Sequence, residues 1–450
     1  MSLALAAAAA ADRRTPPPAP PDGVSPFGLP DPGADFETLS DFRLGSAVFR
    51  QVWTPAGEGA AHFDGLGPLY NARSCDGCHA RDGRGRPPPA GGGAYPAASM
   101  ILRLARAGEA ADSGMAPDPV YGRQLQDAAL AGFAPEGRLR VDYAETAFVF
   151  ADGETAMLRR PRFSIADAAH GPPHAATVAS ARIAPAMIGA GLIERIPAGD
   201  IIAGADPDDR DGDGISGRAN LVDAGGAMLA VGRFGWKAAQ PDLESQISTA
   251  LSLDMGIATA RHPAGYGDCT AAEAACRAAP DGATPAFESL EAHSVIVGWL
   301  VRYAANLAVP APRGVDGATV AAGKALFADI GCAACHRPAF TTAPDPDQPH
   351  LGNRRIAPYS DFLLHHMGEG LADGLAEGRA AGGEWRTQPL WGIGLTREVN
   401  GNMAFLHDGR ALSLTEAILW HGGEAAAARE AFAALDAASR ARLIAFLDAL

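Results

Sequence analysis

Cys332-Ala-Ala-Cys335-His336 is the stretch on which the interpretation of the whole chain depends. Two thiols in a Cys-x-x-Cys spacing can bond both vinyl groups of one haem, and the histidine that follows can bind its iron. The same pattern recurs upstream in Cys75-Asp-Gly-Cys78-His79. A Gly-x-x-x-Phe step precedes each copy, from Gly45 to Phe49 and from Gly323 to Phe327. The repeat predicts two c-type haems. The alternative is two zinc or redox dithiols, but neither copy has a second Cys-x-x-Cys nearby to complete a zinc site.

Composition excludes some classes of function. The chain has 450 residues, enough for two or three domains. Its 54 glycines and 35 prolines favour many loops over long continuous helices. A net charge of -15 argues against a nucleic-acid partner, because no basic stripe is available to neutralise phosphates. An acidic surface can steer a basic redox partner, and it can equally serve solubility.

Two cysteines remain outside the haem motifs, Cys269 and Cys276. In a straight helix their Cα atoms would lie about 10.5 Å apart, which is too far for a disulfide. We expect the segment to loop back and the two thiols to be bonded. A disulfide indicates an oxidising compartment, as covalent haem attachment also does, so we expect a periplasmic protein.

The two ends of the chain suggest its division into domains. Residues 1–35 combine a signal-like apolar start, which lacks a basic n-region, with a proline-rich leader. We expect an N-terminal haem domain over residues 36–308 and a C-terminal cytochrome c-like haem domain over residues 313–450, separated by a proline-rich exit. No later run of about 18 apolar residues occurs, so we expect no transmembrane helix.

The first haem motif lacks an obvious second iron ligand. No histidine occurs between His79 and His170. Met100, His170 or His174 could supply that ligand, but the simpler interpretation is an open or weakly occupied face, which binding a small oxidant requires. The loop over residues 81–89 is rich in arginine and could hold haem propionates or form a solvated basic turn.

Acidic residues offer further candidates. Asp209, Asp211 and Asp213, followed by a turn glycine, match the first ligand positions of a calcium loop, although Asn220 replaces the glutamate expected at its end. The alternative is an acidic surface turn. Asp254 lies in apolar company that raises a carboxyl pKa and suits proton transfer, or it simply ends a helix. Glu194 is an acid/base group or, more simply, a surface charge.

Several short blocks resemble a known family. They are Phe405-Leu-His-Asp-Gly-Arg-Ala411, Leu414-Thr-Glu-Ala-Ile418, Phe234-Gly-Trp-Lys-Ala238, Asp254-Met-Gly-Ile257, Asp211-Gly-Asp-Gly-Ile-Ser-Gly-Arg218 and Trp420-His-Gly-Gly-Glu-Ala425. Together with the two haem motifs they resemble bacterial di-haem cytochrome c peroxidases and MauG-type enzymes. More narrowly, they resemble the di-haem oxidoreductase family once labelled thiol oxidoreductases.

The resemblance implies roles for individual residues. Trp236 would relay electrons between the haems, and Asp254 would move a proton during O–O cleavage, with Gln246 lining the same pocket. His407 occupies the family's aromatic-x-His-x-Gly turn. His421 stands where the family has methionine or tyrosine, and would make the C-terminal haem bis-histidine with His336; Met403, Met367 and His366 are alternatives. The calcium of those peroxidases supports a site at Asp209 to Asp213.

These observations lead to one expectation and its rivals. We expect a mainly α fold of two cytochrome c-like haem domains, the N-terminal one enlarged by loop-rich insertions. The function expected is that of a periplasmic di-haem oxidoreductase that activates hydrogen peroxide at the N-terminal haem, with a small redox protein or a quinol as electron partner. The alternative is an electron-transfer cytochrome with both irons six-coordinate. Metal or thiol oxidation rests on the old family label alone.

Overall fold

The computed structural model describes residues 24–59, 62–89, 99–107, 115–224, 228–314 and 317–450. Most of the expected signal-like segment and leader, residues 1–23, lies outside the described residues. Among the described residues, no helix combines the length and the apolar character that a membrane crossing needs.

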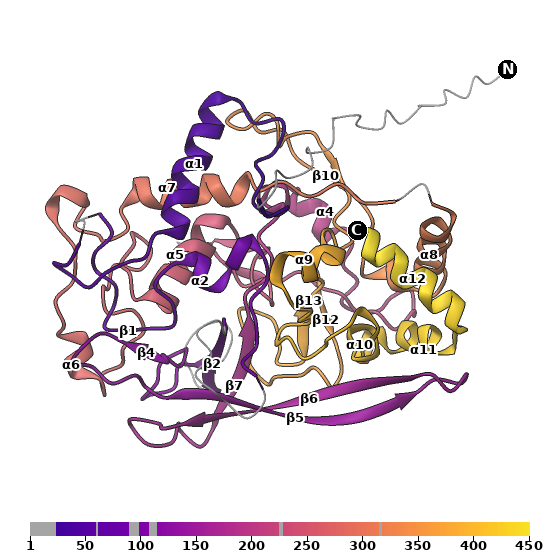
Figure 1. The fold of residues 1–450 in the computed structure, drawn as a ribbon, viewed down its shortest axis with the longest axis horizontal. Coiled ribbons are helices and arrows are strands. Elements are labelled where there is room, and N and C mark those ends of the chain that lie inside the picture. The colour runs from indigo at the N-terminus through magenta and orange to yellow at the C-terminus, as the bar shows by residue number, and fades with distance from the viewer. Residues whose placement is uncertain (1–23, 60–61, 90–98, 108–114, 225–227, 315–316) are drawn as a thin grey trace.

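The longer helices form two packed pairs with shorter helices around them, and α1 crosses α7 in Figure 1. They are α1 (Phe36–Arg50), α2 (Cys75–Cys78), α3 (Ala190–Glu194), α4 (Ala198–Ile202), α5 (Leu243–Met255), α6 (Ala274–Arg277), α7 (Ser294–Ala305), α8 (Ala318–Asp329), α9 (Thr396–Asn400), α10 (Leu414–Leu419), α11 (Ala426–Ala434) and α12 (Ala437–Ala449). Helix α1 packs on α7, and α8 packs on α12.

The strands form several small antiparallel sheets. They are β1 (Leu69–Tyr70), β2 (Met100–Ala107), β3 (Met115–Ala116), β4 (Ala128–Ala129), β5 (Arg138–Val149), β6 (Thr155–Ala166), β7 (Thr177–Ile183), β8 (Leu221–Asp223), β9 (Leu229–Val231), β10 (Phe340–Thr341), β11 (Arg355–Ile356), β12 (Leu364–His366) and β13 (Glu384–Arg386). Strand β2 pairs with β3 and β7, and the other strands pair as β1–β4, β5–β6, β8–β9, β10–β11 and β12–β13.

The expectation of a mainly α fold of two cytochrome c-like haem domains is wrong. Helices make up 29% of the structure and strands 19%. The longest strands, β5 and β6, form a two-stranded ribbon whose base packs one face on the core through Leu139, Val141 and Tyr143. Beyond Tyr143 most residues of β5 are exposed, so the alternation that marks a half-buried strand covers only part of its length.

Both Gly-x-x-x-Phe steps have a packing reason. A Cβ at Gly45 in α1 would collide with the carbonyl oxygen of Trp299 in α7, and a Cβ at Gly323 in α8 would collide with that of Arg442 in α12. Glycine therefore allows each helix pair to cross at close range. The phenylalanine one turn later reaches a haem-motif histidine, with ring centroids 6.3 Å apart for Phe49 and His79.

Two segments of the N-terminal half reach across to the C-terminal half. The tip of the β5–β6 ribbon extends beneath α10, α11 and α12 (Figure 1). There Arg440 of α12 donates hydrogen bonds of 2.6 Å to both Asp152 and Glu154. In the arginine-rich loop, Arg84 donates to the carbonyl oxygens of Ala404 (3.2 Å) and Leu406 (3.1 Å). The boundary expected between residues 308 and 313 stays a prediction, and these contacts tie its two sides together.

The disulfide between Cys269 and Cys276 is confirmed, with a Cα–Cα distance of 6.2 Å. The segment loops back through the short helix α6, as the spacing required. The bond lies in a small apolar cluster with Leu69 of β1, and so fastens the loop that follows α5 to the region around the first haem motif.

Candidate functional site

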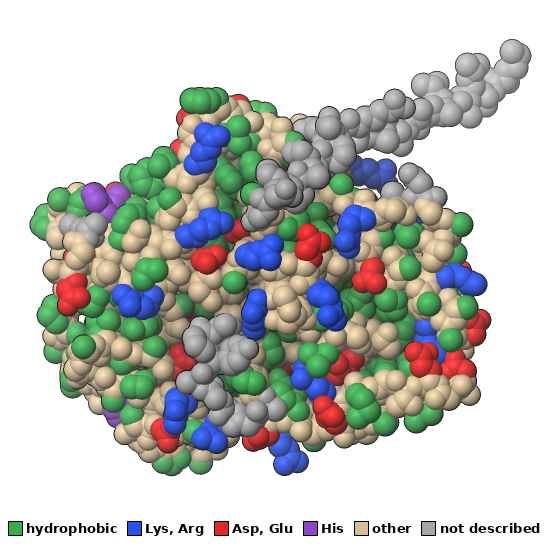
Figure 2. Space-filling model, viewed as in Figure 1, with side chains coloured by type: hydrophobic (Ala, Val, Ile, Leu, Met, Phe, Trp, Pro, Cys, Tyr) green, Lys and Arg blue, Asp and Glu red, His purple; other side chains and the backbone are tan. Residues whose placement is uncertain are grey.

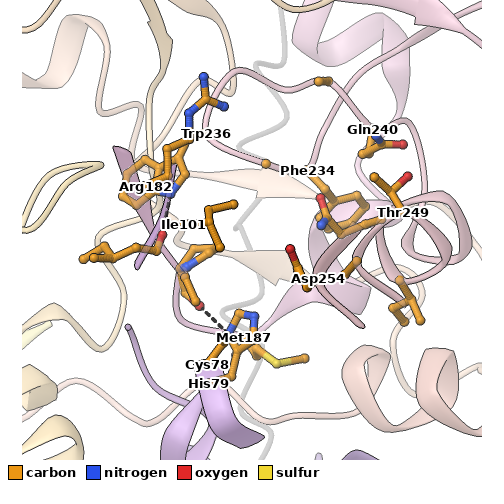
Figure 3. A pocket seen from close by; sticks show the side chains of 18 of the residues that line it. Cys78, His79, Ile101, Arg182, Met187, Phe234, Trp236, Gln240, Thr249 and Asp254 are labelled. Carbon is orange, nitrogen blue, oxygen red and sulfur yellow. Dashed lines mark hydrogen bonds between the residues drawn. The ribbon is translucent and has the colours of Figure 1, made fainter. Parts of the chain in front are cut away.

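A cavity of about 660 Å³ opens behind the first haem motif, within the range of cofactor pockets. Its walls come from both halves of the chain, and Figure 3 labels part of the lining from the N-terminal half. They include every residue that the sequence assigned to this site, namely Cys75, Cys78, His79, Trp236, Gln246 and Asp254. The candidates Met100, His170 and His174 are not among the lining residues. Met187, which the sequence did not single out, is one of them.

His79 is held in the form that binds a metal. It follows directly after α2, which Ser74 caps by accepting a hydrogen bond from the backbone N–H of Gly77 (3.2 Å). The His79 Nδ1 lies 2.9 Å from the carbonyl oxygen of Pro185, to which it donates. That bond fixes the tautomer and leaves Nε2 free as a ligand. Burial lowers the pKa of His79 to about 4, so the ring stays neutral.

Asp254 lines the same cavity as His79 (Figure 3). It occupies the last turn of α5, which ends at Gly256 in the left-handed conformation. One carboxylate oxygen accepts a hydrogen bond of 2.7 Å from the side-chain amide of Gln124. Burial raises the pKa of Asp254, and this outweighs the opposing effects of that hydrogen bond and of Arg103. A carboxyl group with a raised pKa is suited to giving and taking protons.

Trp236 lies at the end of the cavity that faces the C-terminal half. Its indole N–H donates to the carbonyl oxygen of Ile183 (2.8 Å), and the ring is 7% exposed. The Arg84 guanidinium lies 5.4 Å from the ring centroid. His407 is buried on the side toward the second motif, with ring centroids 6.4 Å from Trp236 and 3.8 Å from Trp385, on which it stacks. His407 therefore packs between two tryptophans and does not line the cavity.

Two guanidinium groups in the cavity wall fit an anionic cofactor. Among the described residues, neither Arg84 nor Arg386 takes part in an ion pair, and the buried Nη1 of Arg386 has no hydrogen-bond partner. Burial lowers the pKa of Arg386 to about 9 and that of Arg84 to about 10. A buried cation is costly without a counter-charge, so the site favours a ligand that carries carboxylates, as haem does through its propionates. Binding of haem propionates was one of two interpretations that the sequence offered for the arginine-rich loop that contains Arg84. The sequence gave no indication of Arg386.

The second motif repeats the first in its proximal geometry. Cys332 begins a short 3-10 turn, Cys332–Ala334, and Cys335 follows directly after it. The His336 Nδ1 donates to the carbonyl oxygen of Tyr359 (2.8 Å), which again leaves Nε2 free. Burial lowers the pKa of His336 to about 4. Both histidines are thus oriented in the same way by a backbone carbonyl.

A second histidine stands near His336. His421 follows α10, and its Nδ1 donates to the carbonyl oxygen of Ala417 (2.8 Å), so its Nε2 is also free. After burial, its electrostatic influence is one of the causes that lower the pKa of His336. Among the alternatives, His366 is exposed and its Nδ1 accepts from the backbone of Gly368. The Met403 sulfur lies 3.2 Å from an Arg397 nitrogen.

The acidic loop brings its three aspartates together. Asp209, Asp211 and Asp213 each place a carboxylate oxygen within 4.8 Å of the others. The loop is closed by hydrogen bonds from the N–H of Gly214 to Asp209 (3.1 Å) and from the N–H of Ile215 to Asp213 (2.8 Å). Such an arrangement can serve a hard cation, and it is also common in exposed turns without one. Glu194 is used structurally, since it accepts from the N–H of Leu243 at the start of α5.

Comparison with known proteins defines the class. Over residues 21–102 and 122–450 the chain matches a family described as "Di-haem oxidoreductase, putative peroxidase". This match spans nearly the whole chain, and the chain belongs to that family. It is accordingly an oxidoreductase of a family whose cofactor is haem. No curated protein matches the chain in a sequence search.

Proposed function

We propose that this protein is a periplasmic di-haem c-type peroxidase that reduces hydrogen peroxide at the His79 site and exchanges electrons through the His336 site. The observation that carries the proposal is the unequal surroundings of two equivalent histidines. His79 faces a large cavity whose lining includes the buried carboxyl of Asp254, whereas His336 is buried with His421 among the groups that lower its pKa. One site is arranged for chemistry and the other for electron storage or transfer.

The donor sets fit two haems. Cys75, Cys78 and His79 would hold the first. The second would be held by Cys332, Cys335, His336 and His421. A bound haem supplies an iron that takes peroxide or passes electrons. Arg84 and Arg386 would donate to the propionates of the first haem, because neither takes part in an ion pair within the part of the chain that the structure describes. His421 would be the second protein ligand of the iron in the second haem. Two histidine ligands favour a low-spin iron with a lower reduction potential than that of a His/Met haem.

Asp254 would handle the protons of the reaction. Reduction of hydrogen peroxide to two waters breaks the O–O bond and consumes two protons and two electrons. The raised pKa of Asp254 lets its carboxyl give a proton to the leaving oxygen and take one from the attacking peroxide. Gln124 holds this carboxyl in place, and Gln246 lines the same cavity. Trp236, with His407 and Trp385 stacked behind it, would provide the aromatic path toward the second site.

Calcium and the electron partner complete the proposal. Asp209, Asp211 and Asp213 would bind Ca²⁺. Calorimetric titration of chelator-treated protein with Ca²⁺ measures this binding, and a D211N/D213N variant should abolish it. The electron partner would be a small basic redox protein, attracted by the net charge of -15, or a quinol. Acidic and basic side chains are interspersed on the face shown in Figure 2, so this attraction would come from the net charge and not from one acidic patch on that face. A rate that falls with rising ionic strength supports the protein partner, because salt screens that attraction.

Electron paramagnetic resonance combined with peroxide titration tests the function. The oxidised protein should show one haem open to a small ligand and one low-spin haem, and peroxide should change the spectrum. If both irons are low-spin and neither responds to peroxide or cyanide, the protein is an electron-transfer cytochrome instead. Cell fractionation tests the periplasmic location.

A further inference from the structure

His365 is a buried histidine with a carboxylate on each ring nitrogen. Its Nε2 lies 2.9 Å from Asp361 Oδ2, and its Nδ1 lies 2.7 Å from Glu424 Oε2. Only 2% of the residue is exposed. A carboxylate only accepts hydrogen bonds, so both ring nitrogens must donate and the ring must be an imidazolium. Burial lowers the pKa of His365, but the hydrogen bonds with Asp361, Cys335 and Glu424 outweigh it and raise the pKa to about 12.

This cluster is built against the second haem motif. The Cys335 sulfur lies 3.8 Å from the His365 Nδ1. The backbone N–H of Asp361 donates to the carbonyl oxygen of Cys335 (2.9 Å). A Cβ at Gly217 would collide with the His365 ring, so the chain passes directly over it. The cluster therefore touches the peptide that would carry the haem.

Each carboxylate is fixed by further donors. The N–H of Leu363 donates to Asp361 Oδ1 (2.9 Å). Glu424 accepts from the N–H of His366 (2.8 Å) and from the N–H of Ser216 (3.0 Å). Since these donors stabilise the ionised carboxylates, the cluster holds two negative charges and one positive charge.

We propose that Asp361, His365 and Glu424 form an ion triad whose net negative charge lowers the reduction potential of the C-terminal haem. This rests on the proposed function, in which Cys332, Cys335 and His336 hold that haem. Oxidised haem carries one more positive charge than reduced haem, and a buried negative charge stabilises it because the protein interior screens weakly.

The hydrogen bonds favour an ion triad over a metal site at the same residues. Cys335, Asp361 and His365 lie close enough to share an ion. Both nitrogens of His365 are donors to carboxylates, however, and a histidine binds a metal only through a neutral nitrogen. In addition, the Cys335 thiol would be bonded covalently to the haem and would not serve as a metal ligand.

The E424Q variant tests the triad by removing one charge while keeping the shape. Spectroelectrochemical titration of the C-terminal haem should give a more positive midpoint potential. The expected change in the equilibrium constant for reduction is at least tenfold, which is 59 mV for one electron. D361N should shift the potential in the same direction, and it serves if E424Q does not fold. The matched control is E430Q, because Glu430 is an exposed carboxylate, 72% accessible, paired with Arg429.

The outcomes distinguish a failure of this inference from a failure of the proposed function on which it rests. A positive shift in the triad variants, with the low-spin spectrum retained and E430Q unchanged, supports the triad. An unchanged potential in the triad variants overturns it and leaves the peroxidase untouched. Absence of covalent haem at Cys332 and Cys335 in the unmodified protein overturns both.

Discussion

The surroundings of His79 and of His336 differ although the two motifs share one design. Each histidine donates from Nδ1 to a backbone carbonyl, and each has a phenylalanine close by. The first then faces a cavity whose wall includes Arg84 and Arg386, two guanidinium groups without an ion pair among the described residues. The second faces another histidine and a triad with an excess of negative charge. A repeated peptide thus sets the attachment, and the segments packed around it set the chemistry.

The largest effect is expected for Asp254. D254N should lower peroxide turnover by about 10²- to 10⁴-fold, because a positioned general acid or base contributes that much. Haem content and the spectra of both haems should stay unchanged. Steady-state peroxidase assays check this, with E244Q as the control, since Glu244 lies on the same helix but is exposed. Full activity in D254N would contradict the assignment of Asp254 as the acid/base group that distinguishes the His79 site from the His336 site.

His421 defines the other side of the comparison. H421M should raise the midpoint potential of the C-terminal haem, because a His/Met iron has a higher potential than a bis-histidine one and axial ligands span roughly 0.8 V. H421A should leave this iron open to cyanide. H366Q is the control, because His366 is the exposed neighbouring candidate. If H366Q changes the spectrum and H421M does not, the ligand assignment is wrong.

Glu377 balances the cations behind the first cavity, and its effect should depend on pH. Burial raises the pKa of Glu377, but Arg182 and Arg103 outweigh it and lower the pKa to about 2. A lowered pKa in the folded state adds stability above the unfolded value of about 4.3, and this stability is lost as pH falls toward 2. E377Q should cost about 3–5 kcal/mol at pH 7, as breaking a buried pair does, and less at pH 3. Denaturant unfolding at both pH values measures this difference, and an equal loss at both would contradict the pairing.

Local motifs revealed the site better than they revealed the fold. The disulfide is formed by residues close in sequence, so their spacing was enough to predict it, and the haem peptides were recognised in the same way as a prediction. Trp236 and Asp254 were found through the blocks that contain them, and the structure brings both to one cavity. The assignment of their roles stays a prediction.

Residues without a local signal escaped the sequence. Arg386 reaches the first cavity from β13, and Gln124 reaches Asp254 from the region before β4; only the fold brings them there. The β5–β6 ribbon was missed because the apolar alternation of its base, at Leu139, Val141 and Tyr143, does not continue through the exposed second half of β5. His365 was overlooked beside His366, since nothing in the sequence tells which of the two adjacent histidines is buried.

The smallest effect is expected for loss of the disulfide, and this effect should differ between the His79 site and the His336 site. Replacing Cys269 and Cys276 together by serine should lower the free energy of unfolding by about 2–3 kcal/mol, because the bond closes only a short loop. This loop packs with β1 beside the first motif, so the His79 site should lose its haem spectrum at lower denaturant than the His336 site. Monitoring the two haem bands during unfolding checks this order. Simultaneous loss of both would show that the contacts of Arg84 and of the ribbon join the two regions into one cooperative unit.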